Sequence, residues 1–151
     1  MNELHAAKFQ QVIAPVAIVD DASWTTAYID TLDYDYCTII FNLGATDIAM
    51  AALKVQESDA SGSGYADISG ADCDGSTDAF GGTAALPSAT DDGNVIVFQI
   101  DLNGRKRYLD LVATAGNGST GSFGSAVAIL TKAAVAPESV SAAGCETLIR
   151  V

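Results

Sequence analysis

The apolar and polar positions of this chain alternate with a period of two, or form short apolar blocks, instead of repeating every 3.6 residues. The alternation is clearest over residues 94–102 and again over residues 105–114, with Asn103-Gly104 between the two segments. Asn-Gly favours a tight type I′ turn because both residues tolerate positive φ. The pattern therefore predicts a two-stranded hairpin over residues 94–114.

Other segments also have the composition of strands. They lie at residues 12–19, 24–31, 36–43, 48–57 and 123–132. Residues 36–43 are almost continuously apolar, which predicts a strand covered on both faces. No segment is an amphipathic helix long enough for a parallel crossover. Many short strands with Gly-rich turns predict an all-β fold, namely an antiparallel, jelly-roll-like β-sandwich.

The chain of 151 residues fits a single domain, residues 1–151. The segments at its two ends lack clear strand companions, and we expect residues 1–21 and 133–151 to act as N- and C-terminal arms. Residues 70–90 form a long stretch without a clear period. Such a loop is unusual in a compact domain and is either functional or mobile.

The net charge of the chain makes some classes of binding partner unfavourable. Nineteen acidic residues against seven basic ones give a net charge of −12. Nucleic acids and anionic membranes are therefore unfavourable partners, since both are bound through clustered Lys and Arg. The sequence contains neither a signal-peptide pattern nor the ~20-residue apolar run of a membrane span. We expect a soluble protein made in a cytoplasm, with three free cysteines.

Catalytic groups are scarce in the sequence. Its one histidine, His5, lies near the N-terminus, whereas Ser/His/Asp and Cys/His chemistry requires a positioned imidazole. Aromatic residues make up 7% and include a single tryptophan, which disfavours a glycosidase because sugar clefts are usually lined by aromatic rings. We therefore expect no enzymatic activity, no catalytic residues and no cofactor.

Two charged segments leave alternatives open. Asp72, Asp74 and Asp78 alternate around a glycine and resemble part of a calcium loop, although the pattern does not fit an EF-hand. They form either a loose structural cation site or a solvated acidic loop, and we predict no metal site. Arg105-Lys106-Arg107 holds three of the seven basic residues. This cluster either binds an acidic partner surface or balances Asp101 and Asp110 across the predicted hairpin.

Three segments of the chain are distinctive, namely IDTLDYDYCTIIFNLGATDIAMAALKVQESD (29–59), LPSATDDGNVIVFQIDLNGRKRYLDLVATAG (86–116) and GSAVAILTKAAVAP (124–137). These segments resemble small proteins encoded among the head genes of tailed bacteriophages. The resemblance covers roughly residues 26–137, which is most of the chain. Its most specific parts are the Asp-Tyr block, the Lys54–Ser58 segment, the Gly104–Leu109 strand, and the Ala128–Leu130 strand before Pro137.

The resemblance implies a capsid decoration, or cement, protein. Such a protein is β-rich, binds the major capsid protein on the virion exterior, often as a homotrimer, and has no catalytic residues. We predict that Arg105, Lys106 and Arg107 contact that partner and that the two arms bridge to neighbours. The alternatives are a carbohydrate- or cell-surface-binding module with Tyr65 and Phe80 near its loops, and a tail or head–tail joining protein.

Overall fold

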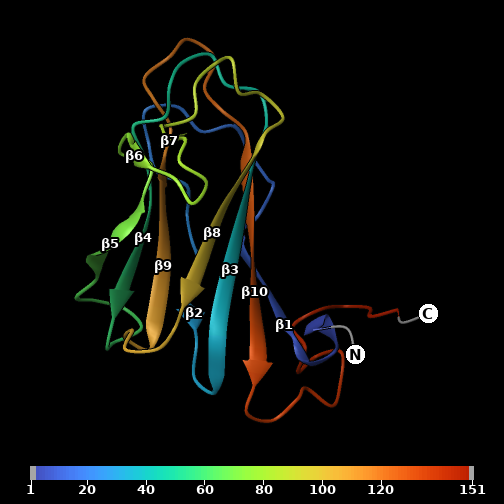
Figure 1. The fold of residues 1–151 in the computed structure, drawn as a ribbon. Coiled ribbons are helices and arrows are strands. Elements are labelled where there is room, and N and C mark those ends of the chain that lie inside the picture. Colours follow the sequence, from blue (N-terminus) through green and yellow to red (C-terminus); the bar gives the residue numbers. More distant parts are fainter. Residues whose placement is uncertain (1–2, 150–151) are drawn as a thin grey trace.

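Two four-stranded antiparallel sheets pack face to face in the computed structural model, which describes residues 3–149 (Figure 1). Sheet A has the strand order β1-β10-β3-β8, and sheet B has the order β2-β9-β4-β5. Strands β6 and β7 form a small separate hairpin. The elements are η1 (Glu3–Ala6, a 3-10 helix), β1 (Lys8–Ile13), β2 (Ile29–Asp30), β3 (Tyr34–Leu43), β4 (Ala52–Ser58), β5 (Ala66–Asp72), β6 (Ser76–Thr77), β7 (Thr83–Ala84), β8 (Val95–Asp101), β9 (Tyr108–Thr114) and β10 (Gly124–Ala133). Within residues 3–149, no helix is long and apolar enough to cross a membrane.

The strand pairs are nested along the chain. Strand β1 pairs with β10, β2 with β9, β3 with β8, and β4 with β5. The chain thus forms a long antiparallel ribbon whose successive pairs alternate between the two sheets. The predicted antiparallel β-sandwich is confirmed, and the nested pairing agrees with the jelly-roll-like winding.

Alternate residues of each long strand fill the space between the sheets. This core is one cluster to which both sheets contribute, as expected when period-two strands bury one face. Phe41 lies at its centre and meets the Trp24 ring edge-on, with ring centroids 5.9 Å apart. The small residues Ala126 and Ala128 of β10 face inward. The largest fully buried apolar side chains are Phe41, Ile13, Ile29, Ile39, Leu53, Leu109, Leu111, Leu130 and Val55.

The predicted hairpin over residues 94–114 is wrong. Its two strands exist as β8 and β9, but β8 pairs with β3 in sheet A while β9 pairs with β4 and β2 in sheet B. A turn does form, because Arg105 N donates to Leu102 O at 3.0 Å and Gly104 has φ of 76°. Asn103 lacks the positive φ that a type I′ turn requires. The segment therefore crosses between the sheets instead of reversing within one.

Three other strand predictions are corrected in extent. Residues 24–31 contribute only the two-residue strand β2, with one isolated bridge just before them at Ser23, and the strand predicted at 48–57 begins at Ala52. The segment predicted at 12–19 is a strand only up to Ile13, because β1 covers residues 8–13. Beyond it, Val19 makes an isolated bridge with Ser122.

Both terminal segments contact the body of the same chain. Strand β1, inside the predicted N-terminal arm, is a full member of sheet A and not a free arm. In the C-terminal segment, Ala143 is buried and its carbonyl accepts a hydrogen bond from Phe9 N at 2.8 Å. Residues 1–2 and 150–151 of the predicted arms lie outside the described residues. Bridging by either segment to a neighbouring molecule stays a prediction.

Candidate partner-binding surfaces

The outward face of sheet A is largely uncharged and has apolar side chains interspersed with neutral polar ones, which are Gln11, Thr38, Asn42, Gln99, Ser125 and Thr131. Strand registry places Val127, Ile40 and Val97 side by side across it. Val95 and Val97 are 55% and 48% exposed. Charged residues border it at one end, where Asp101 lies and where the Lys132 ammonium sits 4.9 Å from the Tyr36 ring centre. We call this surface the apolar face, and its apolar residues are Phe9, Tyr36, Ile40, Val95, Val97, Val127 and Ile129.

The apolar face corrects one prediction from the sequence. The continuous apolar run at residues 36–43 indicated a strand covered on both sides. In the structure Cys37, Ile39 and Phe41 point into the core, whereas Tyr36 and Ile40 point outward and are not fully buried. Nothing within the described residues forms a second layer over this side of sheet A. Of the two sides of β3, only the one that carries Cys37, Ile39 and Phe41 is therefore packed against the core.

The outward face of sheet B is different, because it carries charged and amide groups. Lys54 Nζ lies 2.7 Å from Asp67 Oδ2, and Gln56 Nε2 donates to Asp67 Oδ1 at 2.6 Å. The hydrogen bond from Lys54 is the main reason that the pKa of Asp67 is lowered. Thr26 also donates to Asp110 on this side, at 2.7 Å. Sheet B therefore carries charged and amide groups on its outward face, together with the ring of Tyr108.

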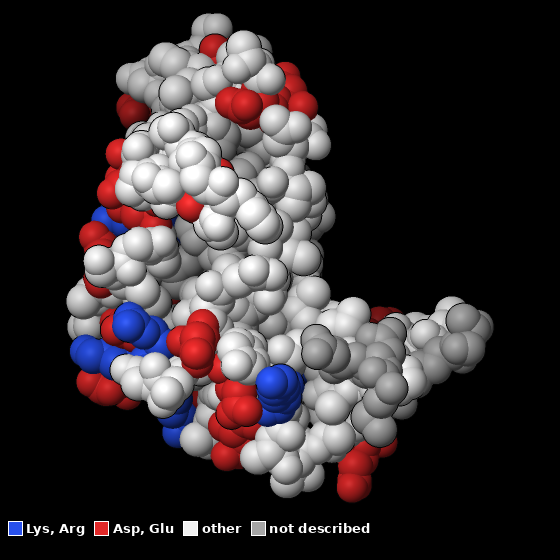
Figure 2. Space-filling view, in the orientation of Figure 1, with Lys and Arg blue, Asp and Glu red and all other residues white. Residues whose placement is uncertain are grey.

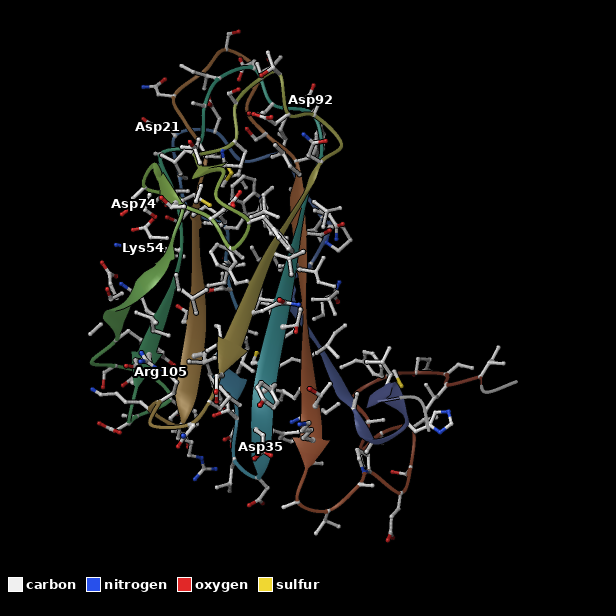
Figure 3. The ribbon with its side chains drawn as sticks, in the orientation of Figure 1. Asp21, Asp35, Lys54, Asp74, Asp92 and Arg105 are labelled. Atoms are coloured by element: carbon white, nitrogen blue, oxygen red, sulfur yellow. The ribbon has the colours of Figure 1, made fainter. Side chains whose placement is uncertain are left out.

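The predicted contact residues Arg105, Lys106 and Arg107 lie together at the end of the sandwich opposite Asp21 and Asp92 (Figures 2 and 3). One end of the segment is held by β3 and the other by the β2–β3 turn. Leu102 N donates to Asp35 O at 2.9 Å, and Arg107 O accepts from the backbone and hydroxyl of Thr31.

Each base of this cluster is paired with an acid of its own chain. Arg105 Nη1 lies 3.4 Å from Glu57 Oε1, and Lys106 Nζ lies 3.4 Å from Asp59 Oδ2. Arg107 makes a two-pronged contact with Asp30, at 2.8 and 2.7 Å. The partners predicted for the balancing alternative, Asp101 and Asp110, are wrong because they assumed the hairpin. Figure 2 shows the basic groups interspersed with acidic ones at this end.

The Arg107–Asp30 pair is the best-formed ion pair of the cluster. Its parallel hydrogen bonds raise the pKa of Arg107 and lower that of Asp30. Arg107 also stacks over the Tyr108 ring, at 5.0 Å from its centre. An acidic partner must therefore compete with internal acids for these cations. The cluster stays a predicted contact site, with less free positive charge than the sequence suggested.

The end of the sandwich opposite the basic cluster consists of loops tied together by carboxylates. Asp47 Oδ2 accepts hydrogen bonds from both the backbone N–H and the hydroxyl of Ser119 and of Thr120. These bonds, led by that from Ser119 N, lower the pKa of Asp47 to about 2. Asp20 accepts a further bond from Gly118 N at 3.1 Å. The carboxylates here join loops to one another, which gives them a structural role.

The carboxylates of Asp74 and Asp78, in the acidic stretch 72–78, accept local backbone hydrogen bonds. Asp74 accepts from Ser76 N, and Asp78 accepts from the N–H groups of Phe80 and Gly82, so both carboxylates shape the β6–β7 hairpin. No group of three potential ligands placed to hold a metal ion occurs among residues 3–149. The structure thus favours the solvated-loop alternative.

Potentially reactive side chains are dispersed through the fold. His5 lies in η1. Cys37 and Cys73 are buried in the core, and Cys145 lies in the C-terminal segment. Burial raises the pKa of Cys37 to about 12 and that of Cys73 to about 11. These two thiols remain protonated at neutral pH, and thiols are poor nucleophiles.

A cluster of tyrosines lies beside sheet B. The Tyr28 and Tyr108 rings meet edge to face with centroids 5.6 Å apart. Tyr65 lies near both, and burial is the main cause of its raised pKa. Phe80 is wholly exposed on the β6–β7 hairpin. Tyr65 therefore has aromatic neighbours, which were not predicted from the sequence because the three tyrosines are far apart along the chain.

Comparison with protein-family models, with curated proteins and with solved structures finds no match for this chain.

Proposed function

We propose that this chain is a non-enzymatic virion structural protein that binds the outer surface of a phage capsid and stabilises contacts between capsomers. The observation that carries the proposal is the apolar face of sheet A. Contiguous exposed apolar surface on a soluble protein marks contact with another molecule. The sequence resemblance to phage head proteins points to the major capsid protein as that molecule.

The difference between the outward faces of the two sheets supports attachment to the capsid through sheet A. Sheet A offers valines and isoleucines without charges in the middle of the face, whereas sheet B offers Lys54, Asp67 and Asp110. A protein attached through sheet A would leave the polar sheet B toward solvent. The net charge of −12 keeps that outer side soluble.

Assembly as a homo-oligomer, a trimer by the resemblance, is part of the proposal. Several copies linked together bind a shell through many weak contacts at once, and their effective concentration raises the overall affinity. Arg105, Lys106 and Arg107, with the segments at the two ends of the chain, are the proposed peripheral contacts in this arrangement.

Binding to phage heads purified from a lysate that lacks this gene tests the proposal. Val127→Glu places a charge on the apolar face, and we expect it to weaken binding by about tenfold or more, the size of a hot-spot loss. Val112→Glu makes the same change on the outward face of sheet B and should leave binding within about twofold. Failure of the unmodified chain to bind, or equal losses for the two folded variants, would contradict the proposal.

One observation favours a second function, a carbohydrate-binding module displayed on the virion. Tyr28, Tyr65 and Tyr108 lie close to Asp110, and sugars are often bound by aromatic rings with nearby polar groups. A glycan array with the folded chain distinguishes the two functions. Specific hits that disappear in Tyr108→Ala would support the carbohydrate function, and an array without hits would count against it.

A further inference from the structure

Sheet A ends in a strand whose outer edge has no partner among the described residues. Strand β8 is the last strand in the order β1-β10-β3-β8. Its seven residues, VIVFQID, contain no proline and no lysine, and its pairing with β3 runs without a bulge. An unguarded apolar edge of this length is a template for another strand.

Two hydrogen bonds fix which backbone groups face that edge. Leu43 N donates to Asn94 O at one end of the β3–β8 pair, and Leu102 N donates to Asp35 O at the other. Hydrogen-bonding positions alternate along an antiparallel strand, so the even-numbered residues of β8 face β3. The N–H and C=O groups of the odd-numbered residues, which are Val95, Val97, Gln99 and Asp101, face the free edge.

The other three sheet edges are each protected. On β1, Phe9 N and Val12 O are already bonded, to Ala143 and Ala27 respectively, and a bulge interrupts the strand. Strand β2 has only two residues. Strand β5 has a bulge in its pairing with β4, and Gly70 gives it a positive φ of 81°. Short strands, bulges and covering segments are the devices that keep edges from pairing, and β8 has none of them.

The long segment between β5 and β8 does not provide the missing cover. Its backbone bonds go elsewhere, with Cys73 N donating to Leu53 O and Pro87 O accepting from Met50 N. In Figure 1 this segment lies toward the loop end of the sandwich, whereas β8 continues to the opposite end. The edge of β8 is therefore accessible along most of its length.

We propose that an extended segment of the protein partner adds to β8 as a fifth strand of sheet A. Local charge favours this occupant over β8 of a second copy, because pairing two copies of the edge would bring together the acids that flank it in sequence, Asp91, Asp92 and Asp101. The segment that fits has apolar residues at alternate positions and basic residues beyond its ends. Main-chain hydrogen bonds supply affinity in this mode, and alternate side chains supply specificity.

This inference rests on the proposed function and names how the capsid protein is held. The strand would lie at the border of the apolar face, so one partner could cover both the edge and the face. Val95 and Val97 belong to both surfaces.

Hydrogen–deuterium exchange of the full chain, free and bound to phage heads that lack it, tests the inference. In the free chain the amides of residues 95, 97, 99 and 101 should exchange rapidly. On binding they should slow by about a hundredfold or more, while the amides of the β5 edge remain fast. Binding without slowing at β8 would overturn the strand addition and leave the proposed function standing.

The remaining outcomes of the exchange experiment are equally decisive. Slowing at β8 in the isolated chain that increases with its concentration would overturn the choice of occupant in favour of a second copy. No binding to the heads would overturn the proposed function and this inference with it.

A pair of variants at one position isolates the backbone contribution. Val97→Pro removes an N–H that faces the edge and leaves the bonds to β3 intact, so we expect binding to fall by about tenfold. Val97→Thr has nearly the same shape, keeps the N–H and should bind within about threefold. Equal binding by the two folded variants would overturn the inference, and the exchange experiment decides it if the proline variant does not fold.

Discussion

The Asp47 side chain shows how a single exposed carboxylate fixes loop geometry. It accepts four hydrogen bonds from Ser119 and Thr120, and its pKa falls to about 2. An unfolded aspartate titrates near pH 3.9. Because the folded pKa is lower, the ionised side chain stabilises the fold above about pH 4, and this contribution is lost as the pH falls toward 2.

We therefore predict that Asp47→Asn lowers the Tm at pH 7 and that the difference from the unmodified chain shrinks as the pH approaches 2. Thermal unfolding of both proteins between pH 2 and pH 7 measures the effect. A difference that does not change with pH would show that the charge of Asp47 is not its source.

One fully buried phenylalanine and one fully exposed phenylalanine allow a matched test of the core. Phe41 is fully buried against Trp24, and Phe80 is fully exposed. Phe41→Ala should lower the free energy of unfolding by about 3–5 kcal/mol, because it removes apolar contacts and leaves a cavity. Phe80→Ala should change it by less than about 0.5 kcal/mol. Chemical denaturation measures both, and similar values would contradict the assigned core.

Among the elements, the C-terminal segment depends on one glycine for its position. Gly144 has φ of 75°, and a Cβ added there would overlap the carbonyl oxygen of Phe9. Gly144→Ala should therefore release residues 134–149 from β1 while the two sheets remain folded. Gly62→Ala is the control, because a Cβ at that position meets no atom within 4 Å.

Limited proteolysis measures this release. We expect faster cleavage within residues 134–149 in Gly144→Ala, with unchanged cleavage in Gly62→Ala and a sandwich that still unfolds cooperatively. Equal cleavage of the two variants would mean that the close approach of Gly144 to Phe9 does not hold the segment.

The strands show what sequence periodicity can predict and where it fails. The positions of β3, β8, β9 and β10 follow from the pattern of neighbouring apolar and polar residues, and their extents were predicted closely. The hairpin at Asn103-Gly104 was not predicted correctly, although a turn is present. A dipeptide determines the local turn, whereas the sheet that each strand joins depends on packing against β3 and β4, which are distant in sequence.

For the molecule as a whole, the surfaces were harder to predict than the core. The basic cluster is visible in the sequence, but its partners Glu57 and Asp30 lie 48 and 77 positions from the arginines that they bind. The apolar face was missed because an outward isoleucine has the same sequence signature as a buried one. Only the arrangement of layers shows that sheet A is covered on one side.

The basic cluster yields a prediction for the assembled particle. Replacing Arg105, Lys106 and Arg107 together by serine should slow attachment to phage heads and weaken its dependence on salt, as expected for peripheral charges. The internal pairs make the loss smaller than that from a charge on the apolar face. Association rates at low and physiological salt measure the effect, and rates equal to those of the unmodified chain would remove the cluster from the contact surface.

The most direct test of the central claim is the copy number of this chain in purified phage particles, measured by quantitative mass spectrometry against the major capsid protein. A protein that decorates a symmetric shell occupies every equivalent position, so we predict on the order of hundreds of copies per particle. Roughly six or twelve copies would instead indicate a ring-shaped joining protein. Absence from intact particles would contradict the account.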